Sequence, residues 1–316
     1  MNAAPEAPSP WSDALLAAAL FALDPPATGG VALRAGAGPV RELWLEALRR
    51  RLPAGIPWRR VPPQVADDRL LGGLDLAATL AAGRPVADRG LLAEADGGVL
   101  LLPMAERLAA GTVARLTAAL DTGSVALERD GLNRRSAARF GVVALDEGAD
   151  DDERTPGALL DRLAFHLDLT GVSLGATRGI GAEHIPEAAL NEHSVELPDA
   201  VLESLAKAAM QLGVDSPRAV LLALKVARLA AALAGRRQVR AEDAAAAARL
   251  VLAPRATRLP EPPEQEQPEQ EPQAPDDPAP GQPADDDRET DGGTLAETVV
   301  NSARAAMPEG LLQQLL

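Results

Sequence analysis

The sequence predicts an α/β fold in which a parallel sheet carries helices on both faces and is followed by an all-helical unit and a disordered acidic segment. Up to about Thr170, short apolar runs alternate with amphipathic helical patterns, which is typical of strand–helix–strand units. From about Glu187 to Pro254 every pattern is helical. Residues 259–293 then hold nine prolines and twelve acidic residues, and so few apolar groups cannot offset the entropy of ordering the chain.

Apolar runs define the elements of the first unit. Ala14–Leu23 lacks the basic flank of a signal peptide and is too short to cross a bilayer. It predicts a buried helix with Ser12 or Asp13 near its N-cap. The next elements are a strand, a helix after a glycine turn, and two further strands: Val31–Leu33, Pro39–Leu52, Gly98–Leu102 and Phe140–Leu145.

Capping signals divide the helical unit. Its first helix, Leu197–Leu212, ends before Gly213, and Ser216-Pro217 opens the second with an N-cap and a first-turn proline. A third helix ends before Pro254. We therefore expect a core over residues 1–186, a helical unit over 187–255 and a linker over 256–293. Apolar periodicity returns in residues 294–316, which predicts the start of a further C-terminal region and a natural protein that continues.

Composition restricts the classes of function. The absence of cysteine excludes disulfides and thiolate metal sites and fits a cytoplasmic location. The three histidines lack the spacing and company of metal ligands. Of the net charge of -15, residues 259–293 contribute -11, because twelve acids face one arginine; the remainder carries -4. The chain thus has no global basic field for nucleic acid.

A glycine-rich turn lies between the first strand and its helix, which is the context of a nucleotide-binding P-loop. The pattern G-x-x-x-x-G-K-[ST] places Leu33 at the first glycine and Gly38 at the second, with Gly36 between them. Pro39 then takes the lysine position and Val40 the Ser/Thr position. The cation for the β- and γ-phosphates and the hydroxyl for Mg²⁺ are both lost.

The strand over Val99–Leu102 has the apolar character of a Walker B element, after which two acids should hold Mg²⁺. Pro103 and Met104 follow instead. The acidic run Asp146–Glu153 would also repel phosphate. Both Walker motifs thus lack the residues that bind phosphate and Mg²⁺, although the apolar strands around them remain. We therefore expect no nucleotide bound by this chain.

Four further motifs occur in the order found in the AAA+ subunits of magnesium chelatase. Asp67–Leu76 resembles the motif after the second strand of that family, and Gly90–Gly98 resembles its lead into Walker B. Leu127–Phe140 is similar to its hairpin insert, and Leu159–Arg162 to its arginine-finger segment. Together they cover about residues 12–254 and imply an AAA+ core with a helical lid.

Within that family, the degenerate Walker motifs and the acidic linker resemble the D subunit more than the ATPase (I) subunit. The resemblance implies that Arg162 is an arginine finger, which acts on the γ-phosphate bound by a neighbouring subunit. Such a residue can be retained after the nucleotide site of its own subunit is lost. Arg218 matches the sensor-2 position. The alternative for Arg162 is a structural role in which it pairs with Asp161 or Asp168. The alternative for Arg218 is a solvated position in the first turn of its helix.

Arginines also cluster around the expected hairpin insert. Arg129, Arg134 and Arg135 form either a surface for docking a partner or a solvated charged hairpin. The integrin-like domain of the D subunit carries a D-x-S-x-S metal motif, and that motif does not occur in this sequence.

The resemblance implies a non-hydrolysing subunit that joins the ATPase (I) subunit in a mixed hexameric ring. With the porphyrin-binding H subunit, that complex inserts Mg²⁺ into protoporphyrin IX during bacteriochlorophyll synthesis, using ATP and Mg²⁺ that this chain does not itself bind. Two alternatives stay open at this point: a divergent ATPase related to the MoxR group, which binds nucleotide through backbone amides, and a stand-alone AAA+ adaptor.

Overall fold

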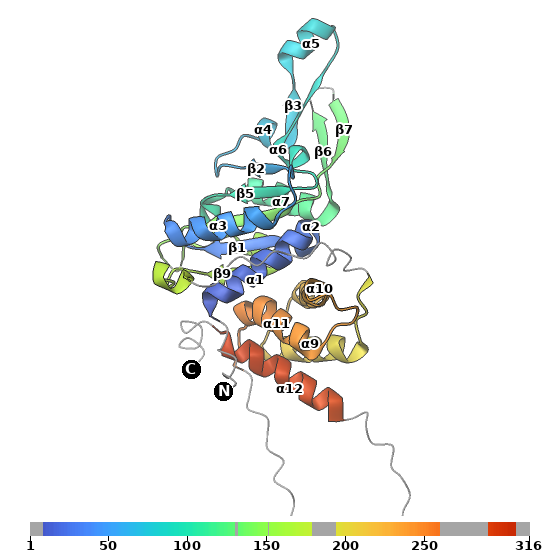
Figure 1. Ribbon diagram of the computed structural model, residues 1–316. Coiled ribbons are helices and arrows are strands. Elements are labelled where there is room, and N and C mark those ends of the chain that lie inside the picture. The colour runs from blue at the N-terminus through green and yellow to red at the C-terminus, as the bar shows by residue number, and fades with distance from the viewer. Residues whose placement is uncertain (1–8, 130–131, 151, 179–193, 260–289, 308–316) are drawn as a thin grey trace, which may run out of the picture.

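A computed structural model describes residues 9–129, 132–150, 152–178, 194–259 and 290–307 (Figure 1). Its centre is a five-stranded sheet with the order β2-β5-β8-β1-β9, in which every pair is parallel. The predicted parallel α/β core is therefore confirmed. The strands are β1 (Gly30–Arg34), β2 (Trp58–Arg60), β5 (Val99–Leu102), β8 (Gly141–Asp146) and β9 (Phe165–Asp168).

Side chains of the central strands alternate between two apolar cores. On β8, for example, Val143 packs into one core and its neighbours Val142 and Ala144 pack into the other. Because successive side chains of a strand point to opposite faces, both faces of the sheet are covered. One face is covered by α1 (Pro10–Leu23) and α3 (Pro39–Arg51), the other by α6 (Leu91–Glu94), α7 (Ala110–Thr122) and α8 (Gly157–Leu160).

The first helix begins earlier than the sequence predicts. The N-cap of α1 is Ser9, whose side chain accepts a hydrogen bond from the Ser12 backbone N–H at 3.1 Å. Ser12 and Asp13 therefore lie inside the helix, because Pro10 takes a first-turn position that suits proline. Trp44 of α3 donates its indole N–H to the Ala14 carbonyl of α1 at 2.8 Å, which joins the two helices.

Two antiparallel hairpins extend from one end of the core (Figure 1). In the first, α5 lies between the two strands, and the exposed Leu76 and Leu80 belong to that helix. The second is the hairpin insert expected from the sequence. The elements are α4 (Asp67–Leu71), β3 (Gly72–Leu74), α5 (Leu76–Ala82) and β4 (Ala87–Arg89), then β6 (Ser124–Arg129) and β7 (Leu132–Ala137).

The predicted helical unit is an all-helical lid. It contains α9 (Asp199–Gln211), α10 (Pro217–Leu233) and α11 (Ala241–Ala247), which continues through a π-helical turn to Leu252 and a 3-10 turn to Arg255. The final described helix, α12 (Thr290–Ala305), packs on this lid and buries Val299 and Ala303 there. Most of the expected acidic linker, residues 260–289, lies outside the described residues.

The lid and the core share one continuous apolar cluster, which contains residues of α1, α3, β1 and β9 together with residues of α9, α10, α11 and α12. The short helix α2 (Pro25–Thr28) also contacts α10. Across the described ranges, no helix is both long enough and apolar enough to span a membrane.

Candidate functional site

The turn that resembles a P-loop connects β1 to α3 at the carboxyl edge of the sheet. Pro39 is the first residue of α3, and Val40 packs partly buried against the core under that helix. A Cβ added at Gly36 or Gly38 would meet no atom within 4 Å, so the turn is open. Gly38 contributes no side-chain cap to α3. Neither a lysine nor a hydroxyl lies at the positions that grip phosphate and Mg²⁺ in an active P-loop.

An internal ion pair fills part of the same edge. Arg34, at the end of β1, lies 3.3 Å from Asp146 Oδ1 at the end of β8. The other carboxylate oxygen of Asp146 accepts hydrogen bonds from the Thr155 backbone N–H at 2.7 Å and hydroxyl at 2.9 Å. Arg34 also donates to the carbonyls of Asp150 and Glu153, both at 3.2 Å. Arg34 and Asp146 thus fix the base of the acidic loop between β8 and α8.

A second group of charges lies beside the first turn of α3. Arg41 Nη1 is 3.0 Å from Glu147 Oε1, and the Glu147 backbone N–H donates to Glu106 Oε2 at 3.0 Å. The Glu106 side chain is only 2% exposed. It lies on the 3-10 turn after Met104, whose left-handed φ of 49° reverses the chain directly after Pro103. Sequence reasoning stopped at these two residues and missed Glu106, the acid that the reversal returns to this edge.

Two arginines of this edge, Arg34 and Arg41, are paired with the carboxylates of Asp146 and Glu147. Within the described ranges, no group of three or more His, Cys, Asp or Glu side chains could hold a metal ion. Because the lysine, the hydroxyl and the acids of the Walker motifs are replaced in this sequence, we expect the purified chain to release no phosphate from ATP above background. Pro39→Lys should not restore hydrolysis, because the Walker B acids would still be missing. Steady phosphate release that is lost on heat denaturation would contradict this expectation.

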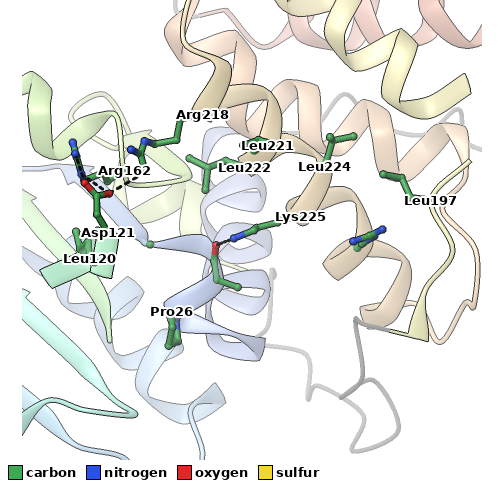
Figure 2. Close-up of a pocket in the computed structure, with 13 residues that line it drawn as sticks. Pro26, Leu120, Asp121, Arg162, Leu197, Arg218, Leu221, Leu222, Leu224 and Lys225 are labelled. Carbon is green, nitrogen blue, oxygen red and sulfur yellow. Dashed lines mark hydrogen bonds and ion pairs between the residues drawn. The ribbon is translucent and has the colours of Figure 1, made fainter. Parts of the chain in front are cut away.

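Arg162 and Arg218 lie together at the opposite edge of the sheet, where both bind Asp121 of α7 (Figure 2). Arg162 donates through Nε to Asp121 Oδ1 at 2.9 Å and through Nη2 to the second oxygen, and Arg218 Nη1 reaches Oδ1 at 3.1 Å. The hydrogen bond from Arg162 is the main cause that holds the pKa of Asp121 below its usual value. Arg162 thus forms an ion pair within the chain, as the alternative expected, but its partner is Asp121 and not Asp161 or Asp168.

Asp161 has a different role, because it connects the core to the start of the lid helix α10. It accepts from the hydroxyl of Ser216, the N-cap of α10, at 2.6 Å and from Arg218 Nε at 3.2 Å. The two arginines are therefore held by carboxylates from two segments, α7 and the turn after α8. Such bidentate and shared pairs restrict the orientation of a guanidinium more than a single contact does.

Between this edge and the lid lies a cleft of about 420 Å³ (Figure 2). Gly29, between α2 and β1, lines this cleft with φ of +69°. A Cβ there would lie 2.0 Å from the Arg162 carbonyl oxygen, so only glycine allows this close approach. The lid side of the cleft is formed by Leu197, Arg218, Leu221, Leu222, Leu224, Lys225 and Arg228.

Arg255, in the last turn of the lid, holds the segment that carries Arg162, and the sequence analysis missed it. Its guanidinium donates to the Ala164 carbonyl at 3.0 Å, to the Leu160 carbonyl at 3.3 Å and to the Leu163 carbonyl. Burial lowers the pKa of Arg255 to about 10. Burial, with Arg255 at 2.9 Å from Nε2, also lowers the pKa of His166 to about 3, so this imidazole is neutral at pH 7.

The hairpin arginines lie elsewhere. Arg134 and Arg135 are exposed on β7, which pairs with β6 at the end of the core that lies away from α10 in Figure 1. Arg129 is the last residue of β6, and its side chain lies outside the described part. The structure therefore brings Arg162 and Arg218 together and keeps both apart from the hairpin insert and from the turn at Gly36–Val40.

Comparison with known proteins adds to this geometry. Residues 202–276 match the AAA lid domain family. The chain is 43% identical over 310 residues to the magnesium-chelatase 60 kDa subunit of Cereibacter sphaeroides. The aligned region covers 97% of this chain and 51% of that protein. Identity to the magnesium-chelatase 67 kDa subunit of Chlorobaculum parvum is 33% over 266 residues, or 77% of this chain and 42% of that protein. The chain thus spans about half the length of the curated relatives it matches.

A solved structure supports the fold alone. A candidate ATPase from Cytophaga hutchinsonii superposes with a TM-score of 0.56 at 16% identity, over 75% of this chain and 80% of the other. The AAA lid match extends the same conclusion to the helical unit. With identity to the chelatase subunits across nearly its whole length, the chain belongs to the family of magnesium-chelatase 60 and 67 kDa subunits and has an AAA+ core with a helical lid.

Proposed function

We propose that this chain is the AAA+ part of a magnesium-chelatase D subunit that binds no nucleotide of its own. It joins the ATPase (I) subunit in a mixed hexameric ring in the cytoplasm. The complex uses ATP and Mg²⁺ to insert the metal into protoporphyrin IX, bound by the H subunit, in bacteriochlorophyll synthesis. The observation that carries this proposal is the 43% identity to a chelatase 60 kDa subunit over 97% of the chain.

The geometry supports a non-hydrolysing role. At the carboxyl edge of the sheet, Arg34 and Arg41 pair with Asp146 and Glu147. In an active AAA+ subunit, that edge would offer cations to phosphate and free carboxylates to Mg²⁺. Loss of those groups accounts for a subunit that contributes to the complex without an ATPase cycle of its own.

The opposite edge supports an action on a neighbour. Arg162 and Arg218 are only partly exposed, and Asp121 holds both in one place. An arginine finger needs a fixed orientation toward a phosphate outside its own subunit. We assign Arg162 to that role and Arg218 to a sensor-2-like role beside it. The hairpin arginines Arg129, Arg134 and Arg135 are assigned to partner docking.

The test is association with the ATPase subunit. We expect the purified chain to bind the chelatase ATPase subunit in the presence of ATP with a dissociation constant of about 1 μM or tighter, a range typical of specific complexes. Isothermal titration calorimetry measures the affinity, and an unrelated AAA+ ATPase serves as the control partner. Failure to bind either the chelatase ATPase subunit or the control ATPase would favour a stand-alone adaptor. Binding of nucleotide by the chain alone would favour the divergent ATPase.

A further inference from the structure

Asp121 lies where a helix by itself disfavours a carboxylate. It is the penultimate residue of α7, whose last four residues are Ala-Leu-Asp-Thr, without a basic side chain. The carboxyl end of a helix carries partial negative charge, so an acid in this turn is unfavourable. The hydrogen bond from Arg162 nevertheless holds the pKa of Asp121 below its usual value, so the group is ionised at pH 7. The groups that stabilise this carboxylate therefore come from outside α7.

Two arginines meet at one oxygen of this carboxylate (Figure 2). Arg162 Nε lies 2.9 Å from Asp121 Oδ1, and Arg218 Nη1 lies 3.1 Å from the same oxygen. Guanidinium groups whose nitrogens lie within about 6 Å of each other repel, unless a negative charge lies between them. Asp161 pairs with Arg218, whereas Asp121 pairs with both arginines. Asp121 is therefore the group that allows the two cations to lie together.

The backbone and the side chain of Arg162 are held by different residues. Its carbonyl lies so close to Gly29 that a Cβ there would be 2.0 Å away, and Arg255 binds carbonyls on both sides of it in the sequence. The side chain is held by Asp121 through Nε and Nη2 and by the Ala158 carbonyl, at 2.7 Å, through Nη1. Loss of the Asp121 carboxylate should therefore reorient the guanidinium without moving the segment that carries it.

The pairing leaves part of each guanidinium available. A guanidinium has five N–H donors. Arg162 uses three of them, on Asp121 and on the Ala158 carbonyl, and Arg218 uses two, on Asp121 and Asp161. The other donors have no partner among the residues that the structure describes, and the two side chains are 20% and 42% exposed. Such donors suit an anion with several oxygens, as in a phosphate group.

We propose that Asp121 is a positioning residue: by pairing with Arg162 and Arg218 at once, its carboxylate directs their remaining N–H donors toward the γ-phosphate of a nucleotide bound by a neighbouring subunit. This inference deepens the proposed function and rests on it for the identity of that neighbour. Asp121 acts through the two arginines and makes them one unit, so removing its charge misplaces both. A displacement of about 1 Å can cost about 100-fold in rate.

Side-chain NMR measures this positioning directly in the 316-residue chain. We expect the Nε–H of Arg162 to be as ordered as the backbone, with an order parameter of about 0.85. Asp121→Asn removes the charge with little change in shape and should lower that value below about 0.6. Asp199→Asn makes the same chemical change at an exposed position of α9 and should leave it unaltered. An Arg162 that stays ordered in Asp121→Asn would overturn the proposal.

Kinetics of the chelatase reconstituted with the full-length D subunit test the consequence. Asp121→Asn should lower Mg²⁺ insertion by about tenfold or more and total phosphate release partially. Both effects should appear in kcat and not in KM for ATP, because the ATPase subunit supplies the nucleotide site. Asp121→Asn combined with Arg162→Ala should be no slower than Arg162→Ala alone, since residues that act as a unit are not additive. Asp121→Glu retains the charge and should recover part of the rate.

A merely structural role for Asp121 predicts a different outcome. Asp121→Asn would then leave both rates equal to those of the wild type, or its effect would add to that of Arg162→Ala. Either result overturns the proposal. Affinity of the wild-type chain for the ATPase subunit is measured first, by calorimetry. If the two do not bind, the proposed function fails, whereas the order parameter of Arg162 still decides whether Asp121 positions it.

Discussion

Arg255→Met should lower the free energy of unfolding by about 3 kcal/mol, because three or more buried carbonyls would lose their donor at once. The Arg255 guanidinium donates to the carbonyls of Leu160, Leu163 and Ala164, and it also reaches the Val251 carbonyl. Methionine retains much of the side-chain volume and packing but donates no hydrogen bond. Urea unfolding followed by circular dichroism measures the change, provided that the slope of the transition is the same for both proteins.

Two variants separate this effect from the loss of a positive charge. Arg258→Met removes an exposed arginine three residues away and should change stability by less than about 0.5 kcal/mol. Arg255→Lys keeps the charge but lacks the planar fork that reaches several carbonyls, so it should recover less than half of the loss. Equal stability of Arg255→Met and the wild type would show that water replaces the guanidinium without cost.

Arg162→Ala should lower ATP turnover by the reconstituted chelatase partially and Mg²⁺ insertion by a larger factor. Loss of an arginine finger costs about 10³-fold or more at one site. Only the interfaces between this subunit and an ATPase subunit contain Arg162, however, so sites formed by two ATPase subunits keep their activity. The measurement compares phosphate release and Mg-protoporphyrin formation by complexes assembled with the full-length D subunit.

Arg237→Ala, at an exposed lid position, is the control and should leave both rates unchanged. Because Asp121 would lose its bidentate partner, the unfolding midpoint and the affinity for the ATPase subunit must be measured for Arg162→Ala as well. If both rates equal those of the wild type while assembly is intact, Arg162 serves only to connect α8 to α7 through Asp121.

The strands of the core could be predicted because a buried parallel strand needs an uninterrupted apolar run. Val99–Leu102 and the strand ending at Asp146 show such runs, and both lie in the sheet where the sequence placed them. The helices of the lid could be predicted for a similar reason, since Gly213, Ser216 and Pro217 mark their ends. Signals of this kind are local in sequence.

The contacts of the candidate site are not local. Asp121 is 41 residues from Arg162 and 97 from Arg218, and Arg255 binds carbonyls more than 90 residues away. No spacing rule connects such positions, because the partner of a guanidinium depends on how the lid packs on the core. Glu106 was missed for another reason: the left-handed residue Met104 redirects the chain, and a methionine gives no signal of that conformation.

The shared apolar cluster has a mechanical consequence. Because α10 packs against both α1 and α2, one apolar interior continues from the sheet into the lid beside the charged cleft. A force applied at Arg162 or Arg218 is therefore transmitted through close-packed side chains rather than absorbed by bending. The core and the lid are therefore expected to move together as one body when the edge of the sheet is displaced.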